Sequence, residues 1–394
     1  MKNGGEGRRR KKYALPGPTG GTRNEMKEKN TVRLAISADA IASPAAQHAL
    51  THAAEVIRAG GTVAFPTETV YGLGANALST QAVEGIFLAK QRPGWDPLIV
   101  HVADAAMLDR VALHAAETVQ SKIDRLIAAF WPGPLTLLLP RNPTVPSAVT
   151  AGRVLVGVRM PAHPVARAFI AAAGVPIAAP SANRFGHTSP TTAQHVLDDL
   201  DGRIDLVLDA GAAWCGVEST VIEVTEQGIL LYRPGAVAAE EIEAVVGPVI
   251  LYQPPHVSPG NAMQHPQSLP SPGVDMRHYA PKARVIPLEM QAYAEADAPA
   301  RWLRLVIERS IDQSWEPAKV GIMLPMGWPL PEPFIGVRYA WGSWGNDREL
   351  AQRLFAGLRS LDTMGVDVIL CPLPSGVGMG AAIRDRLLKA ARRE

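Results

Sequence analysis

The segment from Thr62 to Gly74 constrains the fold more than any other part of this 394-residue chain. A short apolar run ends at Pro66, and hydroxyl side chains, a tyrosine and two closely spaced glycines follow it. One predicted helix later comes the sequence Lys-Gln-Arg-Pro-Gly-Trp-Asp-Pro-Leu-Ile-Val-His, which ends at His101. Apolar strands that open into small polar residues are typical of a pocket at the edge of a sheet. The two cations beside it suit an anionic ligand that carries phosphate.

The composition is typical of a water-soluble globular protein, with 47% hydrophobic and 19% charged residues. No apolar run reaches the roughly 18 residues of a membrane span, and no apolar core follows the basic N-terminus as in a secretory signal. The two cysteines, Cys215 and Cys371, lie far apart in the sequence. They exclude a disulfide framework and a cysteine-rich zinc site, so we expect a cytoplasmic protein with no membrane partner.

The N-terminal 30 residues carry most of the charge asymmetry. They hold nine Lys and Arg against three Glu, a charge of +6, which leaves −4 for the rest because the whole chain has +2. The cluster from Arg8 to Lys12 predicts a disordered basic tail, with weak RNA contact as the alternative. The slightly acidic body argues against broad nucleic-acid binding by the folded part.

Patterns of strands and helices alternate along residues 31–247 and predict an α/β domain around a twisted mixed sheet. Strands are expected at 62–65, 98–102, 135–139, 154–159, 177–179, 206–208, 220–224 and 229–232. Residues 248–283 contain eight prolines and predict a stiff linker. From residue 284 to 394 the pattern returns, with strands at 320–324 and 366–370, and predicts a small doubly wound, Rossmann-like domain.

Lys90 and Arg92 are the first candidates for chemistry. They stand two residues apart where Pro93 is expected to stop a helix. Alone they could be solvated charges that favour the C-terminal end of the helix dipole. No Gly-rich phosphate loop of the Walker type occurs, so a bound nucleotide would need such cations.

Short polar side chains and single cations follow the other predicted strands. Ser181, Asn183 and Ser189 can reach phosphates or sugar hydroxyls, or they can serve turns, and Thr191 could cap the next helix. Arg159 ends an apolar strand, where a guanidinium can grip a carboxylate with two hydrogen bonds. His101 can bond a substrate at the end of its strand.

Arg233 could be a third cation of the pocket or a surface ion pair. The sequence contains no Ser-His-Asp spacing, no His-Glu-x-x-His and no paired catalytic carboxylates. We therefore expect a site that positions substrates and neutralises charge, without a protein nucleophile or a protein-held metal.

Taken in order, these segments resemble the YrdC-like family in its long two-domain form, the threonylcarbamoyl-AMP synthases. The resemblance is carried by Pro66–Gly74, Lys90-x-Arg-Pro with Pro97-Leu and His101, Val158-Arg-x-Pro161, Ser181-Ala-Asn, Ser189-Pro-Thr, Ser219-Thr and Arg233-Pro-Gly. The linker adds Arg277-His-Tyr-Ala-Pro281, and the C-terminal end adds Gly378–Leu387. Each motif is weak alone, whereas the ordered set is specific.

The resemblance implies a nucleotidyltransferase that makes threonylcarbamoyl-AMP and pyrophosphate from L-threonine, bicarbonate and ATP with Mg²⁺. A separate tRNA transferase would then move the threonylcarbamoyl group to the adenosine beside the anticodon. Two rival functions stay open. A non-enzymatic RNA-binding protein is disfavoured by the acidic body, and a carbamoyl-adenylate maker of hydrogenase maturation normally carries cysteine-rich zinc modules.

The resemblance also implies roles for single residues. The residues implied for catalysis are Lys90 and Arg92. Those implied for L-threonine are Thr69, Tyr71, His101, Arg159, Ala179 and Ser219. Those implied for ATP are Lys90, Arg92, Asp96, Leu155, Ser181, Asn183, Ser189 and Arg233. Those implied for a lid in the linker are His278 and Tyr279.

The chain departs from the family pattern at three positions. Asp96 stands where Asn is usual and would bring a negative charge toward ATP. Phe185 replaces a serine, and Met276 replaces a tyrosine of the linker. None of these departures removes a cation.

Overall fold

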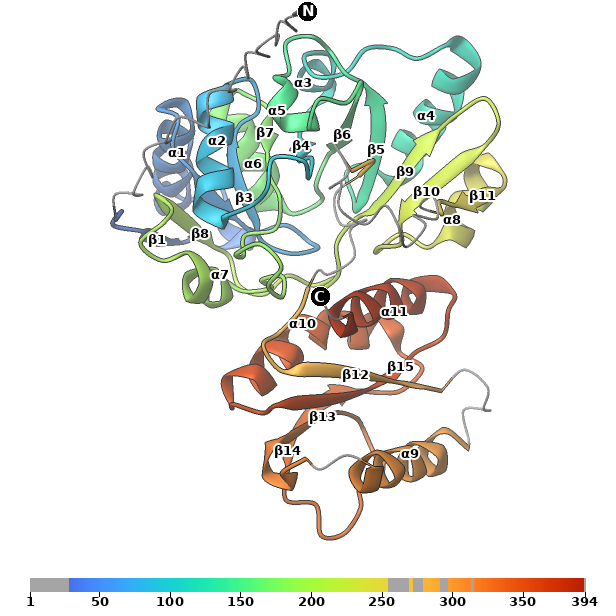
Figure 1. The fold of residues 1–394 in the computed structure, drawn as a ribbon. Coiled ribbons are helices and arrows are strands. Elements are labelled where there is room, and N and C mark those ends of the chain that lie inside the picture. The colour runs from blue at the N-terminus through green and yellow to red at the C-terminus, as the bar shows by residue number, and fades with distance from the viewer. Residues whose placement is uncertain (1–27, 254–268, 272–278, 291–296, 313–314, 393–394) are drawn as a thin grey trace, which may run out of the picture.

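The computed structural model describes residues 28–253, 269–271, 279–290, 297–312 and 315–392. The predicted basic tail up to residue 27 and the linker positions His278 and Met276 lie outside the described residues. Within the described ranges, no helix combines the length and the apolar character that crossing a bilayer requires. Figure 1 shows the chain as a large sheet domain followed by a smaller one, with the smaller domain packed against one side of the larger.

The larger domain is built on one mixed sheet of 11 strands in the order β1-β8-β2-β3-β7-β4-β6-β5-β9-β10-β11. Its strands are β1 (Val32–Ala35), β2 (Val63–Phe65), β3 (Gly72–Asn76), β4 (Ile99–His101), β5 (Leu135–Pro140), β6 (Leu155–Arg159), β7 (Ile177–Ala178), β8 (Leu206–Asp209), β9 (Thr220–Val224), β10 (Ile229–Arg233) and β11 (Val249–Leu251). Its helices are α1 (Pro44–Arg58), α2 (Thr80–Lys90), α3 (Ala105–Asp109), α4 (Glu117–Phe130), α5 (Ser147–Thr150), α6 (Pro164–Ala173), α7 (Ala193–Leu200) and α8 (Ala239–Val246).

Helix α1 illustrates why these residues form these elements. The Ser43 side chain accepts a hydrogen bond from the backbone N–H of Ala46, and Pro44 occupies the first turn, where its missing N–H costs nothing. Its buried face repeats at helical spacing through Leu50, Ala53 and Ile57. The helix therefore begins and packs as its sequence pattern predicts.

Strand register brings the predicted site residues together. Strands β4 and β6 run parallel, with His101 opposite Arg159. Strand β5 runs antiparallel to β6 and parallel to β9, so the starts of β5 and β9 lie beside the end of β6. Strand β10 runs antiparallel to β9, and Arg233 at its end is registered with Val221. The site thus follows from the order and direction of these strands.

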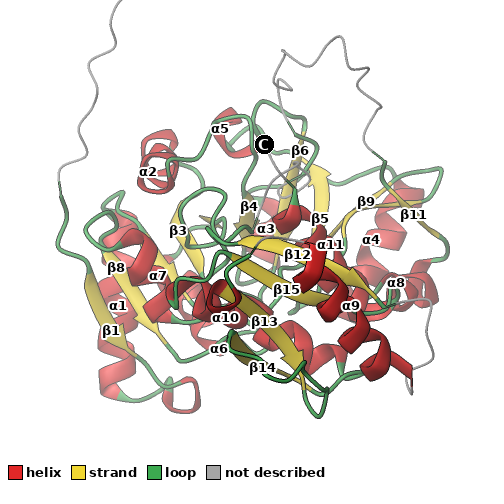
Figure 2. Cartoon of the chain, turned by 60° about the horizontal axis from the view of Figure 1, so that its bottom comes forward, coloured by secondary structure: helices red, strands yellow, loops and turns green. Residues whose placement is uncertain are grey.

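The smaller domain has four parallel strands in the order β12-β15-β13-β14. They are β12 (Arg284–Glu289), β13 (Val320–Pro325), β14 (Val337–Gly342) and β15 (Val368–Leu373). Helices α10 (Asp347–Thr363) and α11 (Gly378–Ala391) cover one face of this sheet, and α9 (Ala298–Asp312) covers the other, as Figures 1 and 2 show. Both faces are covered, which confirms the predicted doubly wound arrangement.

The two domains share an apolar core. Val70 and Val217 of the larger domain are buried in the same cluster as Leu354 and Ile383 of the smaller one. Gly216 approaches helix α10 so closely that a Cβ there would lie 2.3 Å from the backbone oxygen of Ala351. Such contacts fix the orientation of the smaller domain against the larger.

The expected domain boundary at residue 247 stops short of the sheet. Strand β11 pairs with β10, although its residues fall inside the segment expected to be linker. The prolines that follow dominate the composition of that segment, whereas Val249, Ile250 and Leu251 are a short β-forming run.

We predict that Gly74→Ala lowers the free energy of unfolding by about 1–3 kcal/mol, because overpacking a well-packed core typically costs that much. A Cβ at this position would lie 2.7 Å from Cγ2 of Ile177 and 2.9 Å from Cε1 of Phe65. Gly94→Ala is the control, since nothing lies within 4 Å of its Cβ position. Urea unfolding of both variants checks this, and equal midpoints would contradict the close packing.

Candidate active site

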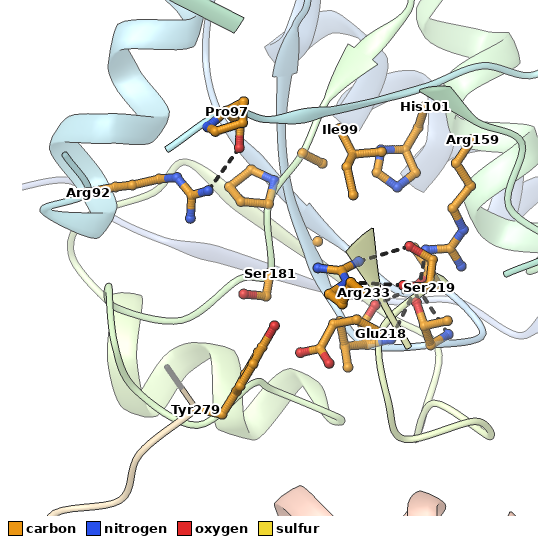
Figure 3. A pocket seen from close by; sticks show the side chains of 16 residues that line it. Arg92, Pro97, Ile99, His101, Arg159, Ser181, Glu218, Ser219, Arg233 and Tyr279 are labelled. Atoms are coloured by element: carbon orange, nitrogen blue, oxygen red, sulfur yellow. Dashed lines mark hydrogen bonds between the residues drawn. The ribbon is translucent and has the colours of Figure 1, made fainter. Parts of the chain in front are cut away.

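A small polar cavity lies where these strands meet (Figure 3). Its volume is about 50 Å³, enough for a few water molecules. Predicted site residues that line it are Thr69, Arg92, His101, Arg159, Ala179, Ser181, Ser219, Arg233 and Tyr279. Figure 3 shows them coming from both sides of the cavity, with Arg92 near Pro97 and with His101 and Arg159 together at the other end.

Arg159 is buried and held on three sides. Its Nη2 pairs with Oε1 of Glu68 at 2.7 Å, Nη1 donates to Oγ1 of Thr69 at 3.0 Å, and Nε donates to the carbonyl of Gly133 at 3.2 Å. A guanidinium has five N–H groups, so these contacts leave one on each terminal nitrogen. Arg159 can therefore still grip a carboxylate with two hydrogen bonds.

His101 lies beside Arg159 at the end of β4 and is 4% exposed. Burial, helped by the positive charge of Arg159, lowers the pKa of His101 to about 3. The imidazole is therefore neutral around pH 7 and can offer one donor and one acceptor to a ligand. It does not act there as a cation.

Arg233 reaches the cavity from the end of β10. Its Nε donates to the backbone oxygen of Ser219 at 3.1 Å, and its Nη2 donates to the Ser219 hydroxyl at 3.0 Å. Gly235 makes this approach feasible, because a Cβ there would lie 2.3 Å from the backbone nitrogen of Thr220. Arg233 is 4% exposed, so it belongs to the cavity and is not a surface ion pair.

Arg92 marks the opposite end of the cavity. Its Nη2 lies 2.8 Å from Oδ2 of Asp96 and donates to the carbonyl of Pro97 at 2.9 Å. Its guanidinium carbon lies 5.9 Å from the ring centroid of Phe185, which itself packs edge-on against Trp95. The acidic departure at Asp96 thus pairs with Arg92, and the aromatic departure at Phe185 supports the same guanidinium.

Lys90 lies behind the cavity lining. Its ammonium donates to the backbone oxygen of Ser181 at 2.6 Å and to that of Asn183. Burial, helped by the charge of Arg92, lowers its pKa well below the ordinary value. In this structure Lys90 holds the Ser181–Asn183 segment in place, while Arg92 faces the cavity.

The remaining predicted residues lie outside the lining. Asn183 turns its amide nitrogen to the carbonyls of Arg184 and His187, and its buried amide oxygen has no hydrogen-bond partner among the described residues. The phenol of Tyr71 donates to the carbonyl of Gly211 at 2.6 Å. Thr191 does not cap α7, because the neighbouring Thr192 accepts the bond from the N–H of His195.

Leu155 also lies outside the lining, but its position shows which end of the cavity lies farther from Arg159. It begins β6, four residues before Arg159, which places the two about 13 Å apart along the strand. Ile99 of β4 lies opposite Gly157 of β6. Pro97 comes two residues before Ile99, and Leu155 comes two residues before Gly157, so Pro97 and Leu155 lie toward the same end of the two strands. The Arg92 and Pro97 end therefore lies toward Leu155, away from Arg159.

Tyr279 fills part of the space from the linker side. It is 2% exposed and has a left-handed backbone with φ of 65°, which a bulky residue rarely adopts. Its ring stacks on Phe355 of α10 at 5.8 Å, and the guanidinium of Arg386 lies 5.1 Å from the ring centroid. The linker thus reaches the cavity through Tyr279, and the smaller domain packs against that side chain.

Sequence reasoning missed two carboxylates, Glu68 and Glu218, and one cation, Arg386. Glu218 accepts from the hydroxyl of Ser189 at 2.6 Å and pairs with Nε of Arg386 at 2.7 Å. The sequence could have indicated both carboxylates, because Glu68 lies within the motif Pro66–Gly74 and Glu218 directly precedes Ser219-Thr. A carboxylate buried beside such a motif needs a cation as its partner. Arg386 also stands inside a quoted motif, Gly378–Leu387, but that motif does not indicate that its partner is Glu218.

The donors around the cavity do not form a metal site. In the described part of the chain, no group of three His, Cys, Asp or Glu side chains is placed to hold an ion. The nearby carboxylates of Glu68, Asp96 and Glu218 each pair with an arginine. These three carboxylates are therefore already engaged by arginine side chains.

Comparisons with known proteins agree with this geometry. Residues 55–235 match the Sua5, YciO and YrdC family model, described as telomere recombination. Residues 237–392 match the model described as the C-terminal domain of threonylcarbamoyl-AMP synthase. The threonylcarbamoyl-AMP synthase of Pyrococcus abyssi is 42% identical over 341 residues, which are 86% of this chain and 93% of that protein.

A bacterial relative and a solved structure extend the match. The threonylcarbamoyl-AMP synthase of Bacillus subtilis is 42% identical over 348 residues, which are 87% of this chain and 92% of that protein. The crystal structure of Pyrococcus abyssi Sua5 complexed with L-threonine superposes with a TM-score of 0.76 at 38% identity, covering 92% of this chain and 97% of that one. Because the matches run through both domains, this chain belongs to the two-domain threonylcarbamoyl-AMP synthase family.

Proposed function

We propose that the cavity binds L-threonine at its Arg159 end and the phosphates of ATP at its Arg92 end. The enzyme is a threonylcarbamoyl-AMP synthase, a nucleotidyltransferase of class EC 2.7.7.87 that uses L-threonine, bicarbonate and ATP for tRNA modification. The observation that carries the proposal is the separation of two buried arginines along β4 and β6. The relative solved with L-threonine supports an amino-acid subsite.

The charges suit the reaction. After the amine of threonine has captured carbon dioxide, the carbamate is an anion, and one of its oxygens must attack the α-phosphorus of ATP while pyrophosphate leaves. Two anions approach each other only where fixed positive charge offsets their repulsion. Arg92 and Arg233, which both line the cavity, supply that charge. No protein nucleophile is needed.

We assign the other predicted residues to the same two halves. Thr69, His101, Ala179 and Ser219 accompany Arg159 around threonine, and Tyr71 supports them from behind. Ser181, Asn183, Ser189 and Leu155 accompany Arg92 around ATP, while Lys90 acts by holding the Ser181–Asn183 segment. Mg²⁺ arrives on the ATP phosphates, since magnesium is commonly held by substrate phosphates with few protein ligands.

Both substrates need more room than the cavity offers now. A volume of about 50 Å³ is far below the several hundred Å³ of an ordinary ligand pocket. Tyr279 occupies the side from which the linker approaches, so we propose that Tyr279 and His278 act as a lid that moves on binding. We also propose that the product passes to a separate tRNA transferase. The basic N-terminal tail is proposed to make a weak contact with RNA.

We predict that Arg92→Ala and Asp96→Asn act in opposite directions. Loss of Arg92 should lower kcat/KM for ATP at least about 100-fold, because a charged hydrogen-bond donor to phosphate is lost. Asn at position 96 should lower the KM for ATP about threefold, since it removes the charge that pairs with Arg92. Radiolabelled-bicarbonate turnover measures both.

Arg203→Ala is the matched control, because Arg203 binds the Ala89 carbonyl at the end of α2 from outside the cavity. Turnover of Arg92→Ala at the rate of this control would contradict the assignment of ATP to that end.

We predict that Arg159→Lys raises the KM for threonine about 10- to 100-fold and leaves the KM for ATP within about twofold. Lysine keeps the charge but loses the paired N–H groups that fit a carboxylate. Arg167→Lys, on the exposed side of α6, serves as the control. An unchanged threonine KM with a raised ATP KM would reverse the proposed orientation.

His101 gives a prediction on pH. Its folded pKa of about 3 lies below the ordinary value near 6.5, so its contribution to stability is complete above pH 6.5. That contribution is lost as the pH falls from 6.5 toward 3, by about 1.4 kcal/mol per pH unit, because only the unfolded chain takes up the proton.

Between pH 7.5 and 5.5, the wild-type protein should therefore lose about 1.4 kcal/mol more unfolding free energy than His101→Gln. Urea unfolding at both pH values measures the difference, in which the other titrating groups cancel. Equal losses in the two proteins would mean that His101 takes up its proton while folded.

A further inference from the structure

Arg386 belongs to the smaller domain but reaches into the larger one. It lies on α11 and is fully buried, with an exposed fraction of 0%. Its Nε lies 2.7 Å from Oε2 of Glu218, and its Nη1 donates to the carbonyl of Pro234 at 2.9 Å. Its guanidinium carbon also lies 5.1 Å from the ring centroid of Tyr279. Arg386 thus contacts two residues that line the cavity, Glu218 and Tyr279. It also contacts Pro234, which follows the lining residue Arg233 in the sequence.

Glu218 is the wall residue whose charge matters most. Its other oxygen, Oε1, accepts from Ser189 at 2.6 Å, and the next residue, Ser219, accepts from Arg233. A buried carboxylate without a partner would repel the phosphates that Arg233 and Arg92 are proposed to hold. Arg386 forms an ion pair with Glu218, and its charge, followed by that of Arg233, favours the ionised carboxylate.

Other charges near Arg386 do not replace this contact. Asp385 lies beside Arg386 on α11 and pairs both with Nη1 at 2.6 Å and with Lys389 at 2.9 Å. These partners belong to the smaller domain and do not line the cavity. The ion pair between Arg386 and Glu218 is therefore the charge contact that joins α11 to the cavity wall.

We propose that Arg386 is a positioning residue for the ATP half of the site, and that the smaller domain completes this half by neutralising Glu218. The inference rests on the proposed assignment of ATP to the cations of the cavity. It also predicts that one charge on α11 affects the two substrates unequally. A role in domain docking alone would impair both substrates together.

Steady-state kinetics of the full chain test this with the two substrates varied separately. Arg386→Gln should raise the KM for ATP about 10-fold or more, while the KM for threonine stays within about twofold. Arg386→Lys should recover most of the loss, because it restores the positive charge. Glu218→Gln should not raise the KM for ATP, since it removes the repelling charge.

The double variant Glu218→Gln with Arg386→Gln separates charge from docking. With no anion left to neutralise, its KM for ATP should return to within about threefold of the wild-type value. Arg384→Gln is the matched control, because this arginine of the same helix pairs with Glu289 inside the smaller domain at 2.7 Å. Its kinetics should match the wild type.

The outcomes are distinguishable. A double variant as impaired as Arg386→Gln, or an equal loss for both substrates, would overturn the positioning role. If Arg386→Gln fails to fold, a raised KM for ATP in Glu218→Gln would overturn it instead. Absence of threonine-dependent turnover in the wild type would sink the proposed function itself, whereas an inactive Arg92→Ala beside an unaffected Arg386→Gln would sink only this inference.

Discussion

Buried positive charge, only partly matched by buried carboxylates, is the constraint on which this site depends. Arg92, Arg159 and Arg386 are each less than 9% exposed, and each pairs with an acid at 2.7–2.8 Å. Removing one partner of such a pair would leave an uncompensated charge and typically cost several kcal/mol. The structure thus places cations beside the cavity in the absence of an anionic substrate. The proposed substrates would bind the N–H groups that the carboxylates leave unused.

The strand order of the sheet places these charged residues at two separate ends of the cavity. Because β4 and β6 are parallel and in register, His101 and Arg159 share one end, while Pro97 and Leu155 lie toward the other. The neutral imidazole of His101 adds no positive charge to the end where threonine is proposed to bind. A mixed sheet suits this purpose, because β5 and β9 begin where β6 stops and bring Ser219 to the same place. The separation of the two proposed subsites thus follows from strand direction.

Much of this arrangement could be predicted from the sequence. Apolar runs with turn residues at their ends gave the strands from β4 to β10 within one or two residues. Nine of the predicted site residues, most of them polar and close to strand ends, line the cavity. Strand β3 was missed, since its Gly72 and Gly74 resemble a loop, yet they are needed for close contact with Phe65 and Ile177. A glycine chosen for packing cannot be told from one chosen for a turn without its neighbours.

What the sequence could not supply was the pairing of distant charges. Lys90 was assigned to phosphate by its spacing from Arg92, but its ammonium binds the carbonyls of Ser181 and Asn183, about 90 residues away in the chain. Glu218 and Arg386 are 168 residues apart and belong to different domains. A periodic pattern of apolar residues indicates which face of a helix or strand is buried, but it does not indicate which residues that face contacts. Arg386 lies in the quoted motif Gly378–Leu387, but its partner in the larger domain is visible only in the structure, where α11 packs against Glu218.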